Sequence, residues 1–172
     1  MAKPQRNVQD WSFSGTKPIL ILGDSNINRI PPHTNRKLQL DSYPGAKVYH
    51  LMELFKRTPP IPTAKIVIIS IGINNKDDDP HHTTCKQLRS MIKHASETFP
   101  RASIYIPLIN HSPYLTPAQK HNILLINDSL TKHHNTLQPL PQEAFRTTHD
   151  KIHWTPPTAQ LILDSWCRQL HF

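Results

Sequence analysis

The sequence predicts an α/β fold in which a mostly parallel sheet of four or five strands lies between layers of helices. Segments with strand-like and helix-like patterns alternate along the chain, which indicates βαβ units. Residues 19–22 and 66–69 are entirely aliphatic, as expected for strands that are buried on both faces of a parallel sheet. We therefore expect a three-layer α/β/α sandwich.

The first half of the chain predicts three strands and one helix. The strands are expected at residues 18–22, 38–43 and 66–71. After the second strand, Pro44-Gly45 is a turn signal, and apolar residues at helical spacing then predict a helix over residues 48–56. Because the second strand alternates apolar and polar residues, we expect it to be more exposed than the other two.

The second half of the chain predicts three helices and one strand. The helices are expected at residues 84–99, 116–134 and 155–170, and the strand at residues 102–109. Thr84 and Gln87 have the spacing of a capping box, in which the threonine would cap the first of these helices. The other two helices begin with Thr-Pro, an N-cap followed by a first-turn proline.

The length of 172 residues suits a single domain preceded by a short polar segment. We expect residues 1–16 to form a linker whose end, with Trp11 and Phe13, docks on the folded body, and residues 17–172 to form the domain. No apolar run approaches the roughly 20 residues of a membrane span. The polar start of the chain also differs from a signal peptide. These features predict a cytoplasmic protein.

The formal net charge of +8 favours an anionic partner, either RNA or an anionic lipid surface. The basic residues are scattered, however, and do not form the run that marks a dedicated nucleic-acid-binding arm. Cys85 and Cys167 lack metal-type spacing, so we expect free thiols. The aspartates and histidines of residues 77–82 could bind a metal, but a solvated turn is the stronger interpretation.

Small polar residues follow three of the predicted strands. Gly23-Asp24-Ser25 follows the first, Gly45 the second and Gly72-Ile73-Asn74 the third. Because the carboxyl ends of parallel strands meet at one edge of a sheet, these residues are expected where ligands bind in open α/β proteins. Asp150 and His153 come just before the last predicted helix. Such an ordered set of serine, glycine, asparagine and Asp-x-x-His is what acyl transfer requires.

The chemistry that these residues support is nucleophilic catalysis by a serine. Ser25 needs a base within hydrogen-bond reach, which His153 could supply, and Asp150 could orient the imidazole. The backbone N–H groups of Ser25 and Gly45 and the side-chain amide of Asn74 are candidate donors to an oxyanion. This interpretation requires no cofactor.

Each of these residues also has a simpler interpretation. Asp24 and Ser25 could only cap a helix, Gly45 could only form a turn, and Asn74 could only cap a strand. Trp154 could line an acyl pocket or pack against the last helix. The order of all four segments together, rather than any single residue, favours a hydrolase.

The four segments resemble the sequence blocks of the SGNH, or GDSL-like, hydrolases, and the resemblance extends over residues 19–170. It implies a flavodoxin-like sheet and a catalytic triad of Ser25, His153 and Asp150. Two further Asp-x-x-His patterns occur within residues 78–82. The resemblance favours the pattern that ends at His153, because it directly precedes the final helix.

Within that superfamily, the chain resembles the esterase domain in the first open reading frame of vertebrate LINE-type (non-LTR) retrotransposons. The similarity lies in the run Pro44-Gly45-Ala46-Lys47-Val48, in the turn Ile71-Gly72-Ile73-Asn74 and in the small size. It implies a cytoplasmic hydrolase of short-chain acyl esters, acetyl or lipid. It also implies a longer protein whose other domains bind RNA, with anionic lipid or a membrane surface as a further partner.

Three positions depart from known patterns. Asn26 stands where many SGNH hydrolases have leucine or isoleucine, and Asn75 replaces the acid of their Gly-x-Asn-Asp block, which could loosen the loop that aims Asn74. The Gly-x-Ser-x-Gly elbow of α/β-hydrolases is absent, because Ile27 occupies the second glycine position. The departures leave room for a catalytically weak or inactive module that docks on RNA or anionic lipid. A third interpretation is an acetylesterase that uses the same triad on carbohydrate.

Overall fold

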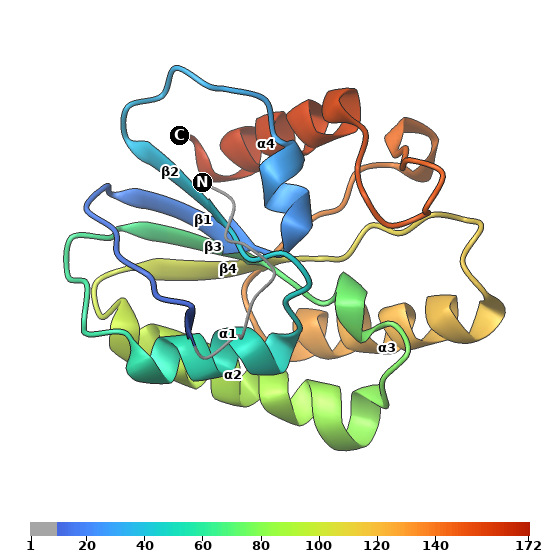
Figure 1. Cartoon of the computed structure of the whole chain (residues 1–172), viewed down its shortest axis with the longest axis horizontal. Helices are drawn as coiled ribbons and strands as arrows, with labels where there is room; N and C mark the ends of the chain where they lie inside the picture. The colour runs from blue at the N-terminus through green and yellow to red at the C-terminus, as the bar shows by residue number, and fades with distance from the viewer. Residues whose placement is uncertain (1–9) are drawn as a thin grey trace.

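The computed structural model describes residues 10–172 and contains a five-stranded sheet in which all strands run parallel (Figure 1). The strands are β1 (Ile19–Gly23), β2 (Leu38–Ser42), β3 (Ile66–Ser70), β4 (Ser103–Pro107) and β5 (Thr136–Leu137). Their order across the sheet is β2-β1-β3-β4-β5. This confirms the predicted α/β fold. Because the strand order reverses at β1 and β3, the carboxyl ends of these two strands border the crevice where such sheets bind ligands.

Four helices cover the two faces of the sheet, namely α1 (Val48–Arg57), α2 (Cys85–Thr98), α3 (Pro117–His133) and α4 (Pro156–Leu170). Leu22 of β1 packs in one cluster with Phe55 of α1 and Met91 of α2, whereas Ile21 packs in the opposite cluster with Ile162 of α4. Successive strand residues point to opposite faces. The result is the predicted three-layer arrangement, with α1 and α2 on one side of the sheet and α4 on the other, next to the short helical turn after β1 (Figure 1).

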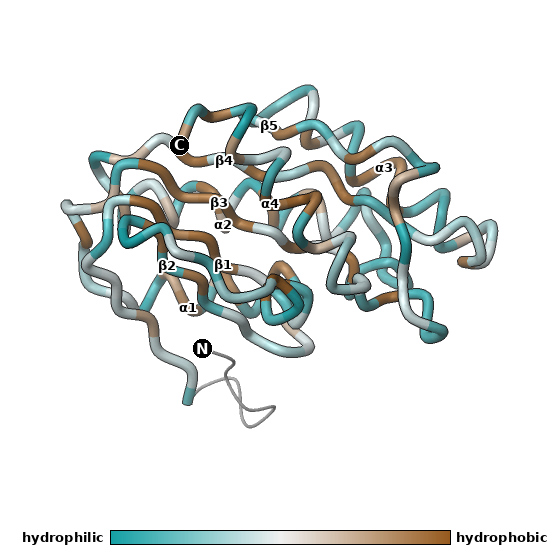
Figure 2. Tube along the Cα trace, turned by 90° about the horizontal axis from the view of Figure 1, so that it is seen from above, coloured by the Kyte–Doolittle hydropathy of each residue, from teal (hydrophilic) through white to brown (hydrophobic). Residues whose placement is uncertain are grey.

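The centre of the molecule is apolar and its periphery is polar (Figure 2). All five residues of β1 are buried, and so are the last four of β3, which explains why these two strands were the clearest in the sequence. The one strand that the sequence did not predict is β5. Its two residues are too short to show any periodicity, and β5 is defined only by its pairing with β4.

The predicted capping box at the start of α2 is wrong. Thr84 has helical backbone angles and its side chain makes no capping hydrogen bond. The helical path begins earlier, in a single π-helical turn at Pro80–Thr84, where the Asp79 carboxylate accepts from the backbone N–H groups of His81 and His82. Asp79 followed by proline is the stronger start signal, because the carboxylate satisfies two free N–H groups and proline needs no acceptor there.

Trp11 and Phe13 are buried in the core next to α1 and α2. The ring of Trp11 lies 5.2 Å from that of Tyr43, and the ring of Phe13 lies 5.9 Å from that of Phe99, measured between centroids. The first nine residues of the predicted linker lie outside the described residues, and the division at residue 16 stays a prediction. Within residues 10–172, no helix is long and apolar enough to cross a membrane.

Candidate active site

The turn that carries Ser25 depends on the close approach of β1 and β3. A side chain at Gly23 would place its Cβ only 2.0 Å from the carbonyl oxygen of Ser70, so only glycine fits there. The backbone N–H of Asp24 donates to the same oxygen at 3.2 Å. The Asp24 side chain then caps the 3-10 turn Ser25–Arg29 by accepting from the N–H of Asn26. Ser25 therefore stands at the carboxyl end of β1 with a fixed backbone.

The structure brings the three residues of the predicted triad together. Ser25 Oγ lies 2.9 Å from Nε2 of His153, although 128 residues separate the two in sequence. The other ring nitrogen of His153, Nδ1, is hydrogen-bonded to the Asp150 carboxylate. This is the order of contacts that a nucleophile, a base and an orienting acid require. The catalytic roles of the three residues remain a prediction.

Asp150 is held by hydrogen bonds from its own loop. One carboxylate oxygen accepts from the Thr148 hydroxyl at 2.7 Å and from the N–H groups of Ile152 and His153 at 2.9 and 3.0 Å. Partial burial would raise the pKa of the Asp150 carboxyl. The hydrogen bonds from His153, Ile152 and Thr148 outweigh it and hold that pKa well below its usual range. Asp150 is therefore an anion at neutral pH, as the partner of an imidazole N–H must be.

The candidate oxyanion donors lie on loops that are hydrogen-bonded to one another. The N–H of Tyr43, two residues before Gly45, donates to the Gly23 carbonyl at 2.8 Å. Asn74 Nδ2 donates to the carbonyl of Ala46 at 2.9 Å. Both loops thus meet the end of β1 at the same edge of the sheet. Among residues 10–172, no acceptor takes a hydrogen bond from the backbone N–H of Ser25 or of Gly45. The role of these two N–H groups as oxyanion donors remains a prediction.

Asn75 does not loosen the loop that carries Asn74. Its side chain is buried, accepts from the N–H of Val48 at 3.1 Å and donates to Asp78 at 3.1 Å. Asp78 in turn forms a salt bridge with Lys47 at 3.1 Å. The oxygen of the Asn75 amide therefore accepts from α1 as an aspartate oxygen at this position could. The amide NH₂ makes a second hydrogen bond, to the carboxylate of Asp78, that an aspartate could not donate.

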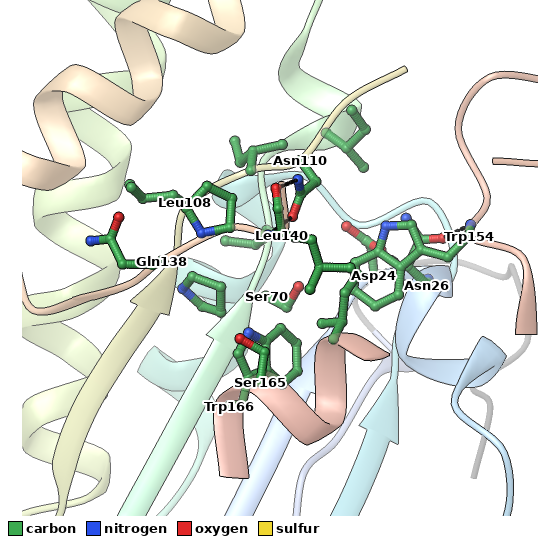
Figure 3. Close-up of a pocket in the computed structure, with 16 residues that line it drawn as sticks. Asp24, Asn26, Ser70, Leu108, Asn110, Gln138, Leu140, Trp154, Ser165 and Trp166 are labelled. Atoms are coloured by element: carbon green, nitrogen blue, oxygen red, sulfur yellow. Dashed lines mark hydrogen bonds between the residues drawn. The ribbon is translucent and has the colours of Figure 1, made fainter. Parts of the chain in front are cut away.

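A small cavity of about 30 Å³ lies between the ends of the strands and α4, and both neighbours of Ser25 in sequence, Asp24 and Asn26, line it (Figure 3). It has room for about two water molecules. The buried Asp24 carboxyl lies at one end, and its burial raises its pKa to about 6. Trp154, which was a candidate wall of an acyl pocket, lines this cavity and packs edge-on against Trp166 of α4, with ring centroids 6.3 Å apart.

Two residues that hydrogen-bond to the triad or to the loop that carries it, Asn26 and Thr148, were not predicted to do so from the sequence. Asn26 was noted only as a departure from the SGNH pattern, yet it is buried beside the His153 loop. Thr148 is a partner of the Asp150 carboxylate. The only sequence signal for Asn26 was its departure from the leucine or isoleucine of the SGNH pattern, and the sequence held no signal for Thr148. Within the described residues, no three metal-ligating side chains form a group.

No known family model matches the sequence, and no curated protein resembles it significantly. Solved structures do share its fold. A member of the lipolytic G-D-S-L family from Veillonella parvula is 13% identical, with a TM-score of 0.68 over 88% of this chain and 96% of its own. A GDSL-like lipase from Bacteroides thetaiotaomicron is 11% identical, with a TM-score of 0.67 over 91% of this chain and 88% of its own.

The acetylxylan esterase Axe2 from Geobacillus stearothermophilus is also similar, with 14% identity and a TM-score of 0.58 over 92% of this chain and 95% of its own. These identities are low, so the similarity concerns the path of the backbone. Together with the parallel sheet and its strand order, it identifies the architecture. The chain therefore has the fold of the GDSL-like hydrolases.

Proposed function

We propose that this protein is a serine ester hydrolase that uses Ser25 as nucleophile, His153 as base and Asp150 as orienting acid. The observation that carries the proposal is the 2.9 Å contact between Ser25 Oγ and His153 Nε2, with Asp150 on the other ring nitrogen. The same fold in GDSL-like lipases and in an acetylxylan esterase supports it. The proposal requires no cofactor.

The reaction would proceed through an acyl-enzyme. His153 takes the proton of Ser25 as Oγ attacks the ester carbonyl, and the oxyanion that forms accepts from the N–H groups of Ser25 and Gly45 and from Asn74. His153 then gives the proton to the departing alcohol. In the second half of the cycle, water attacks the acyl-serine while His153 takes its proton, and His153 then returns that proton to Ser25 Oγ as the carboxylic acid is released. Asp150 stays ionised and stabilises the imidazolium in both halves.

The proposal is tested by covalent labelling with a fluorophosphonate probe, followed by peptide mass spectrometry. We expect an adduct on Ser25 in the wild-type protein and none in Ser25→Ala or His153→Ala. His149→Ala is the matched control, because it removes an exposed histidine of the same loop and should leave labelling unchanged. A folded, monodisperse wild-type protein that is not labelled would contradict the proposal.

The proposed substrates are short-chain acyl esters, acetyl or lipid. The resemblance to retrotransposon esterase domains favours a lipid or other acyl ester in the cytoplasm, in a longer protein with RNA-binding domains. The acetylxylan esterase fold equally allows acetylated carbohydrate. Values of kcat/KM for aryl esters of increasing acyl length, alongside release of acetate from acetylated xylan, distinguish these substrates.

The alternative proposal is a docking module without significant activity, which the net charge of +8 favours. Its partner would be RNA or anionic lipid. Affinity for single-stranded RNA, and for vesicles with and without phosphatidylserine, should then fall steeply as salt increases. Ser25→Ala would leave this binding unchanged. Absence of any salt-sensitive binding would exclude the alternative.

A further inference from the structure

The side chain of Asn26 forms hydrogen bonds on both sides of His153. Asn26 Nδ2 donates to the carbonyl of Ile152 at 3.2 Å, and Asn26 Oδ1 accepts from the N–H of Trp154 at 2.9 Å. Asn26 is only 2% exposed. Figure 3 shows its side chain next to Trp154, at the end of the cavity where Asp24 lies. A single amide therefore holds the backbone immediately before and after the candidate base.

The loop that carries His153 is braced internally. The N–H of Thr148 donates to the His153 carbonyl at 2.8 Å, which closes the loop. Asp150 accepts from the N–H groups of Ile152 and His153 inside it. These bonds fix the shape of the loop but not its distance from Ser25, because they all lie within residues 148–153.

Other contacts fasten this loop at its base. Trp154 packs on Trp166, and the N–H of Arg146 donates to the Thr158 hydroxyl at 3.1 Å. Both partners belong to α4 and not to the turn that carries the nucleophile. Among the hydrogen bonds of residues 10–172, apart from the Ser25–His153 contact itself, the Asn26 pair alone joins the His153 loop to that turn.

We propose that Asn26 is a positioning residue that sets the distance between His153 and Ser25. Its consequence for catalysis rests on the proposed function. Asn26 directly follows Ser25 in the same 3-10 turn, whose backbone Asp24 fixes by accepting from the N–H of Asn26. A displacement of the His153 loop must therefore break the Asn26 bonds before it can separate the base from the nucleophile.

The position requires an amide, because one bond uses a donor and the other an acceptor. Aspartate would keep the acceptor for the Trp154 N–H but could not donate to the Ile152 carbonyl. Alanine would remove both bonds and leave two buried backbone groups without partners. Asn28 is the matched control, since it lies on the same turn, is exposed and makes no side-chain hydrogen bond with residues 10–172.

The kinetic test compares Asn26→Ala, Asn26→Asp and Asn28→Ala by steady-state ester hydrolysis, using p-nitrophenyl acetate. Misplacing a catalytic group by about 1 Å costs roughly 100-fold in rate. We expect a loss of kcat of this order for Asn26→Ala with KM nearly unchanged, a smaller loss for Asn26→Asp and none for Asn28→Ala. If Asn26→Ala does not fold, the proposal is tested by comparing kcat of Asn26→Asp with kcat of Asn28→Ala.

The decisive step repeats these substitutions in the His153→Ala background, with imidazole added as a replacement base. If Asn26 acts through His153, its substitution should cost little further activity there. An equally large loss in both backgrounds, or an Asn26→Asp variant as active as Asn28→Ala, would overturn the proposal.

A second measurement separates this inference from the proposed function. Hydrogen exchange of the Trp154 amide should be faster in Asn26→Ala, or in the similarly sized Asn26→Leu if Asn26→Ala does not fold, than in Asn28→Ala, because alanine and leucine both remove the acceptor of this N–H. This readout requires no activity. A wild-type protein without labelling at Ser25 would contradict the proposed function alone, whereas unchanged exchange at Trp154 would contradict the Asn26 clamp alone.

Discussion

Asn75 Oδ1 accepts from the backbone N–H of Val48 at 3.1 Å and so joins the loop after β3 to the first turn of α1. In the same two segments, Asn74 contacts the carbonyl of Ala46 and Asp78 pairs with Lys47. Three pairs of side-chain contacts thus hold the loop of Asn74 against the loop of Gly45. The spacing of the candidate oxyanion donors is therefore built into the fold before any substrate binds.

Asn75→Ala should lower the free energy of unfolding by about 1–3 kcal/mol, because it leaves the buried N–H of Val48 without an acceptor. Urea unfolding measures the change. Asn75→Asp should also lower the free energy of unfolding, because the new carboxylate would lie next to the carboxylate of Asp78. Adding Asp78→Asn supplies an NH₂ donor at position 78 for the carboxylate at position 75. The double variant should therefore be more stable than Asn75→Asp alone. Strictly additive effects would show that the two side chains do not interact.

Asn74→Ala should reduce kcat for ester hydrolysis by roughly 100- to 1,000-fold with little change in KM, the usual cost of losing one oxyanion donor. Asn122→Ala is the control, because Asn122 supports the same loop through the carbonyl of Lys76 but is not a candidate donor. Steady-state kinetics on one aryl ester compares the two variants. Equal losses in both would mean that Asn74 matters only for loop structure.

Gly23→Ala should prevent normal folding, because the added Cβ would lie 2.0 Å from the Ser70 carbonyl oxygen and neither backbone can move without separating β1 from β3. We expect a loss of about 3 kcal/mol or more. Gly15→Ala is the comparison, since its Cβ would meet side-chain atoms and no backbone, namely the ends of Leu20 at 3.2 Å and the ring of Phe13 at 3.4 Å. Thermal unfolding followed by circular dichroism should show a large decrease in Tm for Gly23→Ala alone.

The fold was predictable from the sequence because buried parallel strands are continuous aliphatic runs and the helices have amphipathic spacing. The strand ends also indicated which residues could meet, and Ser25, His153 and Asp150 do meet. The contacts of Asn26 and Asn75 were not predictable. A side-chain amide that bonds to backbone groups leaves no periodic signal, and its partners lie up to 128 residues away.

The buried carboxyl of Asp24 should make the protein less stable as the pH rises from about 4 to 6. Its folded-state pKa is about 6, raised by burial and opposed by the N–H of Asn26 and by His153, whereas an unfolded aspartate titrates near pH 3.9. Between these values the folded state binds more protons than the unfolded state, so the free energy of unfolding falls with pH, by up to about 3 kcal/mol.

Asp24→Asn removes this titration while keeping an oxygen that can accept from the N–H of Asn26. Urea unfolding at pH 4, 5, 6 and 7 should therefore give a flatter stability profile for the variant, which gains on the wild type as the pH rises. The titration of Asp150 does not affect the comparison between pH 4 and 7. Its pKa is lowered in the folded state, so its contribution to the free energy of unfolding is lost only as the pH falls below about 4. Parallel profiles for the two proteins would mean that Asp24 titrates normally, in contact with solvent.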